Sequence, residues 1–253
     1  MNCLAKYLLF LVSALLVGCA AFKPDTSLPA MVIASPNYDS RHPTMIVVHY
    51  TSNDYVDDSI QTLTSPVRKV SSHYLIDKEG QLYQLVPENQ RAWHAGQSYW
   101  GGNTDINSAS IGIEIDNDGG ESYGDRQIAT LVALIKDIRT RYKIKPNNIV
   151  GHSDVSPGRK VDPGPYFPWQ QVASEGIGIW CKDPDSTPVM EGVGINELLA
   201  GLGYDPRTPE KARQAFRLHY LSDGNGTIIE DPALEMRIAQ CLFNQIGATP
   251  SHQ

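Results

Sequence analysis

The chain has 253 residues, 41% of them hydrophobic, and its 21 basic and 28 acidic side chains give a net charge of −7. This composition is typical of a soluble globular protein with an apolar core. It argues against a nucleic-acid partner, which would require a basic face.

The first residues have the pattern of a bacterial secretion signal. Lys6 supplies a positive charge, and the apolar run over residues 8–17 is too short to span a bilayer, which needs about 20 residues. The Leu-Val-Gly-Cys sequence at 16–19 resembles a lipobox, which predicts a signal peptide over 1–18 and a lipid on Cys19. An ordinary signal peptide cleaved nearby is the alternative. No aspartate follows Cys19, which favours the outer membrane, facing the periplasm, over the inner membrane.

The segment after the lipobox is expected to be a tether. Residues 19–40 hold scattered prolines and no hydrophobic periodicity, so they would link the lipid to the folded domain. Apolar runs and alternating patterns then predict strands at 45–49, 71–77, 81–86 and 110–115.

A mixed α/β domain over residues 41–180 is predicted from the elements that follow. Apolar residues recur at helical spacing over 125–142, which predicts a long amphipathic helix. A short strand at 148–151 would deliver His152 to its end, and a helix at 168–177 would close the domain. Strands interspersed with helices indicate a central mixed sheet flanked by helices.

A small helical domain is expected over residues 189–253, after a turn-rich linker at 181–188. Its three short helices are predicted at 195–202, 209–218 and 232–246. A unit of roughly 60 residues is marginal by itself, so docking on the larger domain is expected.

Two cysteines remain outside the signal and the lipobox. In an oxidising periplasm Cys181 and Cys241 can pair, and the bridge would tie the linker to the last helix. The sequence does not fix the distance between them, so two buried free thiols stay an open alternative.

Three residues have the types and order of a catalytic zinc site. His49 ends the first strand after the tether, and the proline-rich segment 151–164 supplies His152 and Asp162. Two imidazoles and one carboxylate hold a catalytic zinc and leave its fourth position to water, whose pKa falls towards ~7. Two buried, hydrogen-bonded histidines and a solvated aspartate are the alternative. The ordered pattern favours a hydrolase with one Zn²⁺ per chain.

Several motifs, in this order along the chain, resemble the type-2 N-acetylmuramoyl-L-alanine amidases, most of all lipoprotein members of that family. The motifs are His49 after its strand, Ser72-His73-Tyr74, Trp93-His94-Ala95-Gly96, Ile111-Gly112-Ile113-Glu114 and Gly151-His152…Arg159-Lys160-Val161-Asp162-Pro163-Gly164. The resemblance covers residues 40–175 and implies an amidase/peptidoglycan-recognition-like fold. It implies hydrolysis of the amide between the lactyl group of N-acetylmuramic acid and L-alanine, in peptidoglycan and muropeptides. The tail resembles the three-helix peptidoglycan-binding domain of wall hydrolases.

The resemblance also implies roles for residues beside the ligands. Glu114 would be the general base, although a carboxylate between two isoleucines on a strand can equally face solvent. Lys160 would stabilise the oxyanion of the tetrahedral intermediate. Trp93 and His94 would form the wall facing the substrate. Arg159 would grip a substrate carboxylate or lie free on the surface.

Two other functions are compatible with these motifs. One is a non-catalytic peptidoglycan recognition protein on the same fold, but such proteins typically lose a metal ligand, and this chain keeps all three with Glu114 and Lys160. The other is a zinc hydrolase acting on a different amide, such as a peptide bond.

Overall fold

A six-stranded mixed sheet forms the centre of the molecule. The computed structural model describes residues 22–188 and 190–247, so the predicted signal peptide and Cys19 lie outside the described residues. From edge to edge the strands are β1 (Ala30–Val32), β5 (Leu82–Gln84), β4 (Tyr74–Ile76), β7 (Ser110–Ile115), β3 (Met45–Tyr50) and β8 (Ile149–Gly151). Only β4 and β5 pair antiparallel, and the other neighbours are parallel. The predicted mixed α/β fold is confirmed.

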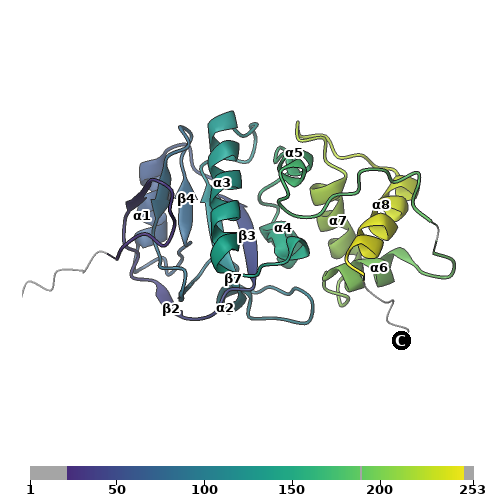
Figure 1. Cartoon of the computed structure of the whole chain (residues 1–253), viewed down its shortest axis with the longest axis horizontal. Coiled ribbons are helices and arrows are strands. Elements are labelled where there is room, and N and C mark those ends of the chain that lie inside the picture. The colour runs from purple at the N-terminus through teal and green to yellow at the C-terminus, as the bar shows by residue number, and fades with distance from the viewer. Residues whose placement is uncertain (1–21, 189, 248–253) are drawn as a thin grey trace, which may run out of the picture.

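The two faces of the sheet are covered by different helices. Ile46 and Val48 of β3 point to α3 (Asp125–Arg141), whose apolar stripe forms a fully buried cluster with them. On the opposite face, Leu75 of β4 packs under α1 (Val56–Thr64). Figure 1 shows α3 lying across the sheet on the side nearest the viewer. Because β3 is buried on both faces, its sequence begins with the continuous apolar run Met45-Ile46-Val47-Val48.

The folded part begins earlier than the sequence predicts, which corrects the expectation of a tether over 19–40. Within that range β1 adds a strand to the sheet edge beside β5, and β2 (Tyr38–Ser40) pairs antiparallel with β6 (Gln90–Ala92). The Asp25 carboxylate also accepts a hydrogen bond from the Gln84 side chain at 2.8 Å. Three-residue edge strands carry too few residues to show periodicity, so their partners, rather than their own pattern, specify them.

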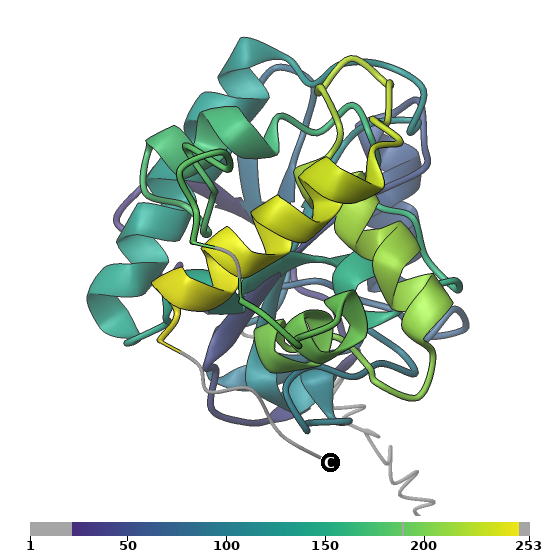
Figure 2. The same cartoon turned by 90° about the vertical axis from the view of Figure 1, so that its right-hand side faces the viewer.

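Four helices form within the described residues of the C-terminal third. They are α5 (Trp169–Ser174), α6 (Ile195–Leu202), α7 (Pro209–Tyr220) and α8 (Pro232–Gln245). Figures 1 and 2 show α6, α7 and α8 grouped at one end of the molecule, beyond the β3–β8 side of the sheet. One apolar cluster joins them to the sheet, with Val47 and Val150 on one side and Leu198 and Phe216 on the other. The expected docking of these helices is therefore observed.

A disulfide joins Cys181 to Cys241, with 5.8 Å between their Cα atoms, which settles the alternative that the sequence left open. It connects the segment after α5 to α8. Two further helices, α2 (Ile106–Ala109) and α4 (His152–Val155), are only four residues long. In the described ranges, no helix is long and apolar enough to cross a membrane.

Candidate metal centre

Sheet register brings His49 and Glu114 together on the face opposite α3. The two residues are direct neighbours across the parallel pair of β3 and β7. Side chains alternate between faces along a strand, so Ile113 and Ile115 turn to α3 while Glu114 turns the other way. Glu114 therefore faces the site, and the solvent-facing alternative does not apply.

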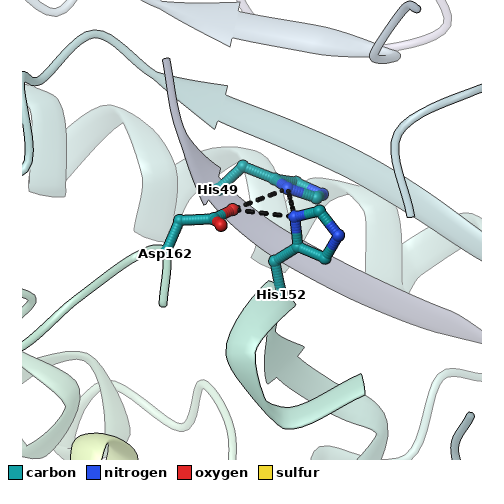
Figure 3. Close-up of side chains that lie close together, drawn as sticks. All are labelled: His49, His152 and Asp162. Carbon is teal, nitrogen blue, oxygen red and sulfur yellow. Dashed lines mark hydrogen bonds and ion pairs between the residues drawn. The ribbon is translucent and has the colours of Figure 1, made fainter. Parts of the chain in front are cut away.

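The ligands predicted from the sequence converge at the end of β3. His152 begins α4 directly after β8, and the Ser153 N–H donates to the Asp162 carbonyl at 2.8 Å, which folds the proline-rich loop back. Asp162 Oδ2 lies 3.0 Å from His49 Nδ1 and 2.9 Å from His152 Nδ1, and the two Nδ1 atoms are 2.9 Å apart. Figure 3 shows the three side chains pointing at one another.

These three atoms fit a cation better than they fit hydrogen bonds. His152 Nε2 lies 3.1 Å from the Ala95 carbonyl and must carry a proton to donate to it. In the neutral ring, the Nδ1 lone pair of His152 then faces the lone pairs of Asp162. A divalent ion removes this conflict because it binds every lone pair, and two imidazoles with one carboxylate are a zinc donor set. All three side chains are buried, and they form a group able to hold a metal ion.

The ionisation of the ligands suits a metal. Burial lowers the pKa of His49 to about 4, with repulsion from His152 adding to the effect, so the ring is neutral at physiological pH. Burial opposes ionisation of Asp162, but its close contacts with the His152 and His49 rings hold its pKa well below the usual range. Neutral imidazoles and an ionised carboxylate are the forms that bind zinc.

Further hydrogen bonds orient the two imidazoles. His49 Nε2 lies 3.0 Å from His94 Nδ1, and His94 Nε2 lies 3.2 Å from Ser110 Oγ. With His49 as donor, the chain runs from His49 through His94 to Ser110 and ends on the Ile106 carbonyl. Such partners fix the tautomer and the ring orientation of metal-binding histidines.

Gly112 makes room for His94. It lies on β7 two residues before Glu114, and a Cβ atom there would come within 2.5 Å of the His94 ring. Its N–H donates to His73 Nδ1 at 3.0 Å, and the His73 ring lies edge-on to the His94 ring with centroids 5.8 Å apart. The absence of a side chain at this position is therefore a condition for the His49–His94 contact.

A cavity of about 310 Å³ opens beside the ligands. Glu114 lines it, and the Oε2 atom of Glu114 is buried with no hydrogen-bond partner among the described residues. Burial, and next the charge of Asp162, raise the pKa of Glu114 well above its ordinary value. A carboxylate with a raised pKa and one buried oxygen free of hydrogen bonds is placed to exchange a proton with a molecule in the cavity.

The remaining predicted residues also line this cavity. Lys160 is exposed at its edge, and Trp93 and His94 lie on its wall. Arg159 lies at its mouth but is already engaged, since Nη2 donates to the Gln97 carbonyl at 2.8 Å and to Ser156 Oγ at 2.6 Å. These positions are compatible with the predicted substrate roles, and the roles themselves stay predictions.

Sequence reasoning missed the residues that hold the site from behind. Asn107 Oδ1 accepts the N–H groups of His94 and Ala95 at 3.0 and 2.8 Å, which sets the turn that carries both. Asp154 is fully buried two residues after His152 and anchors α4. The place of Asp154 in the motif, two residues after His152, could have marked it as a support of the site. Its hydrogen-bond donors, however, come mostly from distant parts of the chain, so the sequence does not identify them.

Comparison with known proteins adds an independent finding. Residues 39–165 match the family model described as N-acetylmuramoyl-L-alanine amidase. The N-acetylmuramoyl-L-alanine amidase AmiD of Escherichia coli K12 is 40% identical, with 80% of this chain and 83% of that protein covered. The 1,6-anhydro-N-acetylmuramyl-L-alanine amidase AmpD of Haemophilus influenzae is 38% identical, over 56% of this chain and 89% of its own length.

Two solved structures are similar over most of this chain. E. coli AmiD, in complex with anhydro-N-acetylmuramic acid-L-Ala-D-gamma-Glu-L-Lys, gives a TM-score of 0.70 at 38% identity and covers 85% of this chain and 92% of its own. AmpDH3 of Pseudomonas aeruginosa gives a TM-score of 0.71 at 30% identity, with 85% and 96% covered. Their likeness therefore extends beyond the sheet domain.

Proposed function

The chain belongs to the N-acetylmuramoyl-L-alanine amidase family, and from this premise we propose how its own residues carry out the reaction. It is a zinc-dependent amidase that hydrolyses the bond between the lactyl group of N-acetylmuramic acid and L-alanine. Peptidoglycan and muropeptides are its substrates. The observation that carries this assignment is the convergence of His49, His152 and Asp162 beside Glu114. The buried Oε2 atom of Glu114 has no hydrogen-bond partner among the described residues.

His49, His152 and Asp162 would hold the zinc. When bound, the ion would act as a Lewis acid, which polarises the amide carbonyl and lowers the pKa of a water molecule. Glu114 takes the proton of the attacking water and passes it to the leaving nitrogen of alanine, which its raised pKa favours.

Lys160 stabilises the negative charge that develops on the carbonyl oxygen, because its ammonium lies on the same cavity as Glu114 and Asp162. Trp93 and His94 form the wall against which the sugar or peptide packs, and Arg159 binds a substrate carboxylate through whichever of its donors remains free. The bound ligands named for the structures of AmiD and AmpDH3, muramyl peptides of the anhydro form, support this substrate class.

Product analysis tests the assignment. The purified full chain is incubated with defined muropeptides of ordinary and 1,6-anhydro sugar, and the products are identified by mass spectrometry. We expect free stem peptide and free muramic acid, loss of turnover after chelation, and recovery on adding zinc. Full turnover after complete zinc removal, or cleavage within the peptide, would contradict the assignment. Binding of muropeptides without products would favour the non-catalytic recognition protein.

The proposed location is the outer membrane, facing the periplasm, with a lipid on Cys19. The lipobox at 16–19 and the absence of a following aspartate support it. Labelling with a palmitate analogue and membrane fractionation check it. Cys19→Ser should lose the label and move to the soluble periplasmic fraction, and a labelled Cys19→Ser protein would refute the assignment.

The proposed organisation is a zinc amidase unit over 41–180, a linker over 181–188 and a peptidoglycan-binding-like helical unit over 189–253. Helices α6, α7 and α8 all fall in the last range, which supports the boundary.

A further inference from the structure

Helix α4 positions two of the three predicted metal ligands, His152 and Asp162. His152 is its first residue, and its Ser153 N–H holds the backbone of Asp162. Directly before it, Gly151 packs so closely on Pro163 that a Cβ atom would lie 2.7 Å from the proline ring. A helix of four residues is too short to be stable by itself, so its position depends on what surrounds it.

Asp154 is the residue that anchors α4. Its carboxylate is fully buried and accepts three hydrogen bonds, each 2.7 Å long. Oδ2 accepts from the Gly151 N–H and from His219 Nδ1, and Oδ1 accepts from the Tyr204 hydroxyl. Two of the three donors thus belong to the C-terminal helical unit. A buried carboxylate that loses a donor is costly, so these contacts constrain the position of α4.

The two donors from the C-terminal unit are themselves rigid. The His219 ring is stacked against Trp169, with centroids 3.7 Å apart, and against Tyr220 at 3.9 Å. Tyr204 is fully buried, and burial, together with the Asp154 charge, raises the pKa of its hydroxyl, which therefore remains a donor. Both donors are therefore held in place by packing of their own, independently of their contact with Asp154.

The C-terminal unit also contacts the loop whose Ala95 carbonyl faces the His152 imidazole. The Gly101 N–H donates to the Gly203 carbonyl at 2.8 Å, and Trp100 packs edge-on against Tyr204 with centroids 5.0 Å apart. The same loop begins at Ala95, whose carbonyl faces His152 Nε2. The C-terminal unit therefore contacts the supports of both the backbone and the imidazole of His152.

We propose that the C-terminal helical unit completes the metal centre, with Tyr204 and His219 as positioning residues that act on His152 and Asp162 through Asp154. The inference rests on the proposed function, because the ion concerned is the zinc of the amidase site. In this account, loss of a donor to Asp154 weakens zinc binding even though neither Tyr204 nor His219 touches the ion.

The experiment measures zinc affinity by competition with a chromophoric chelator in the full-length oxidised protein. Tyr204→Phe removes one hydroxyl, and His219→Phe keeps an aromatic ring in the stack but removes the donor. Glu235→Gln is the matched control, because it disturbs the buried ion pairs of Glu235 with Arg213 and Arg217 in the same helical unit, away from Asp154. Thermal unfolding of the zinc-free proteins reports any general loss of stability.

Each of the two test variants should weaken zinc binding by about 10-fold, the lower end of the effect of losing a direct partner of a ligand, because they act one step further out through Asp154. The absorption spectrum of the cobalt(II)-substituted proteins should shift in the same variants, because it reports the geometry of the ligands. The control should stay within about twofold of wild type. Wild-type zinc affinity in both test variants, or an equal loss in the control, would overturn the inference.

Muropeptide cleavage by wild type in the same preparation separates this inference from the proposed function. If the wild-type protein binds zinc and cleaves muropeptides while the two test variants keep wild-type zinc affinity, the inference is overturned and the proposed function stands. A wild-type protein that binds no zinc would overturn both.

Discussion

At the scale of single residues, the site separates metal binding from proton transfer. Three side chains point their ligand atoms at one place, whereas the buried Oε2 atom of Glu114 has no hydrogen-bond partner in the part of the chain that the structure describes. The strand register that puts Glu114 beside His49 explains how the two functions lie in one cavity yet use different atoms. Substitutions should therefore separate them.

Glu114→Gln should lower the amidase rate by about 10²–10⁴-fold, the usual contribution of a general acid–base group, with the zinc content unchanged. Asp162→Ala should instead lower the zinc content, because it removes a ligand. Metal analysis of the dialysed proteins, together with the rate of muropeptide cleavage, checks both. Equal zinc loss in the two variants would contradict the separate roles.

Gly112→Ala should weaken zinc binding through His94. Its new Cβ atom would lie 2.5 Å from the His94 ring, so His94 must move and lose its contact with His49 Nε2. The overpacking should also cost about 1–3 kcal/mol of unfolding free energy. Chelator competition and urea denaturation measure the two effects. Gly120→Ala is the control, since its nearest atom, on Asp118, would be 3.5 Å away, and a variant indistinguishable from it would refute the role of Gly112.

Sequence patterns identified the ligands at this scale but not their supports. These side chains belong to local motifs, and the structure brings three of them together as a group able to hold a metal ion. His49 and His152 stand at strand ends, Glu114 lies on an alternating strand, and Asp162 lies in a proline-rich loop. Asp154 could not be interpreted in the same way. Its donors Tyr204 and His219 are 50 and 65 residues away, and only the folded chain shows that they meet it.

At the scale of elements, α3 is held to the sheet by charge as well as by its apolar stripe. Arg141, in its last turn, donates from Nε and Nη2 to the two oxygens of Glu88, at 2.9 and 2.6 Å. Glu88 is fully buried and also accepts from the Tyr74 hydroxyl at 2.8 Å. This pair connects the end of α3 with β4 and with the loop after β5.

Arg141→Ala should lower the unfolding free energy by about 3 kcal/mol, because it leaves the buried Glu88 carboxylate without its cation. Urea denaturation measures the change. Lys136→Ala is the control on the same helix, and its exposed pair with Glu175 is screened by solvent, so the midpoint should barely move. Similar shifts of the urea midpoint in the two variants would show that burial of Glu88 does not increase the contribution of its ion pair to stability.

Element length decided which parts of the fold were predictable. The helix at 125–142 and the three C-terminal helices were confirmed within two residues, because each repeats an apolar stripe over at least two turns. The strands β1 and β2 and the helix α4 have three or four residues and no readable pattern. They are specified by backbone partners and by Asp154, which are contacts between distant segments.

At the scale of the whole molecule, the C-terminal helices and the sheet domain share one apolar cluster and a disulfide. The bridge encloses a loop with a sequence separation of 60 residues, and α8 carries one of its cysteines. The protein is therefore stabilised as a unit in an oxidising compartment.

Replacing Cys241 by Ser should lower the unfolding free energy by about 2–4 kcal/mol, because the open loop gains conformational entropy in the unfolded chain. Guanidinium denaturation of oxidised wild type and the variant measures it. The double variant, with Cys181 also replaced by Ser, should match the single variant, which excludes an effect of the free thiol. An unchanged unfolding free energy would show that the bridge contributes nothing.

X-ray absorption spectroscopy at the zinc edge of the full-length protein identifies the atoms bound to the ion. We expect two imidazole nitrogens at about 2.0–2.1 Å and oxygen ligands at about 2.0–2.2 Å, with one imidazole lost in His49→Ala. Sulfur ligands, or an unchanged spectrum in His49→Ala, would show that the zinc is bound elsewhere.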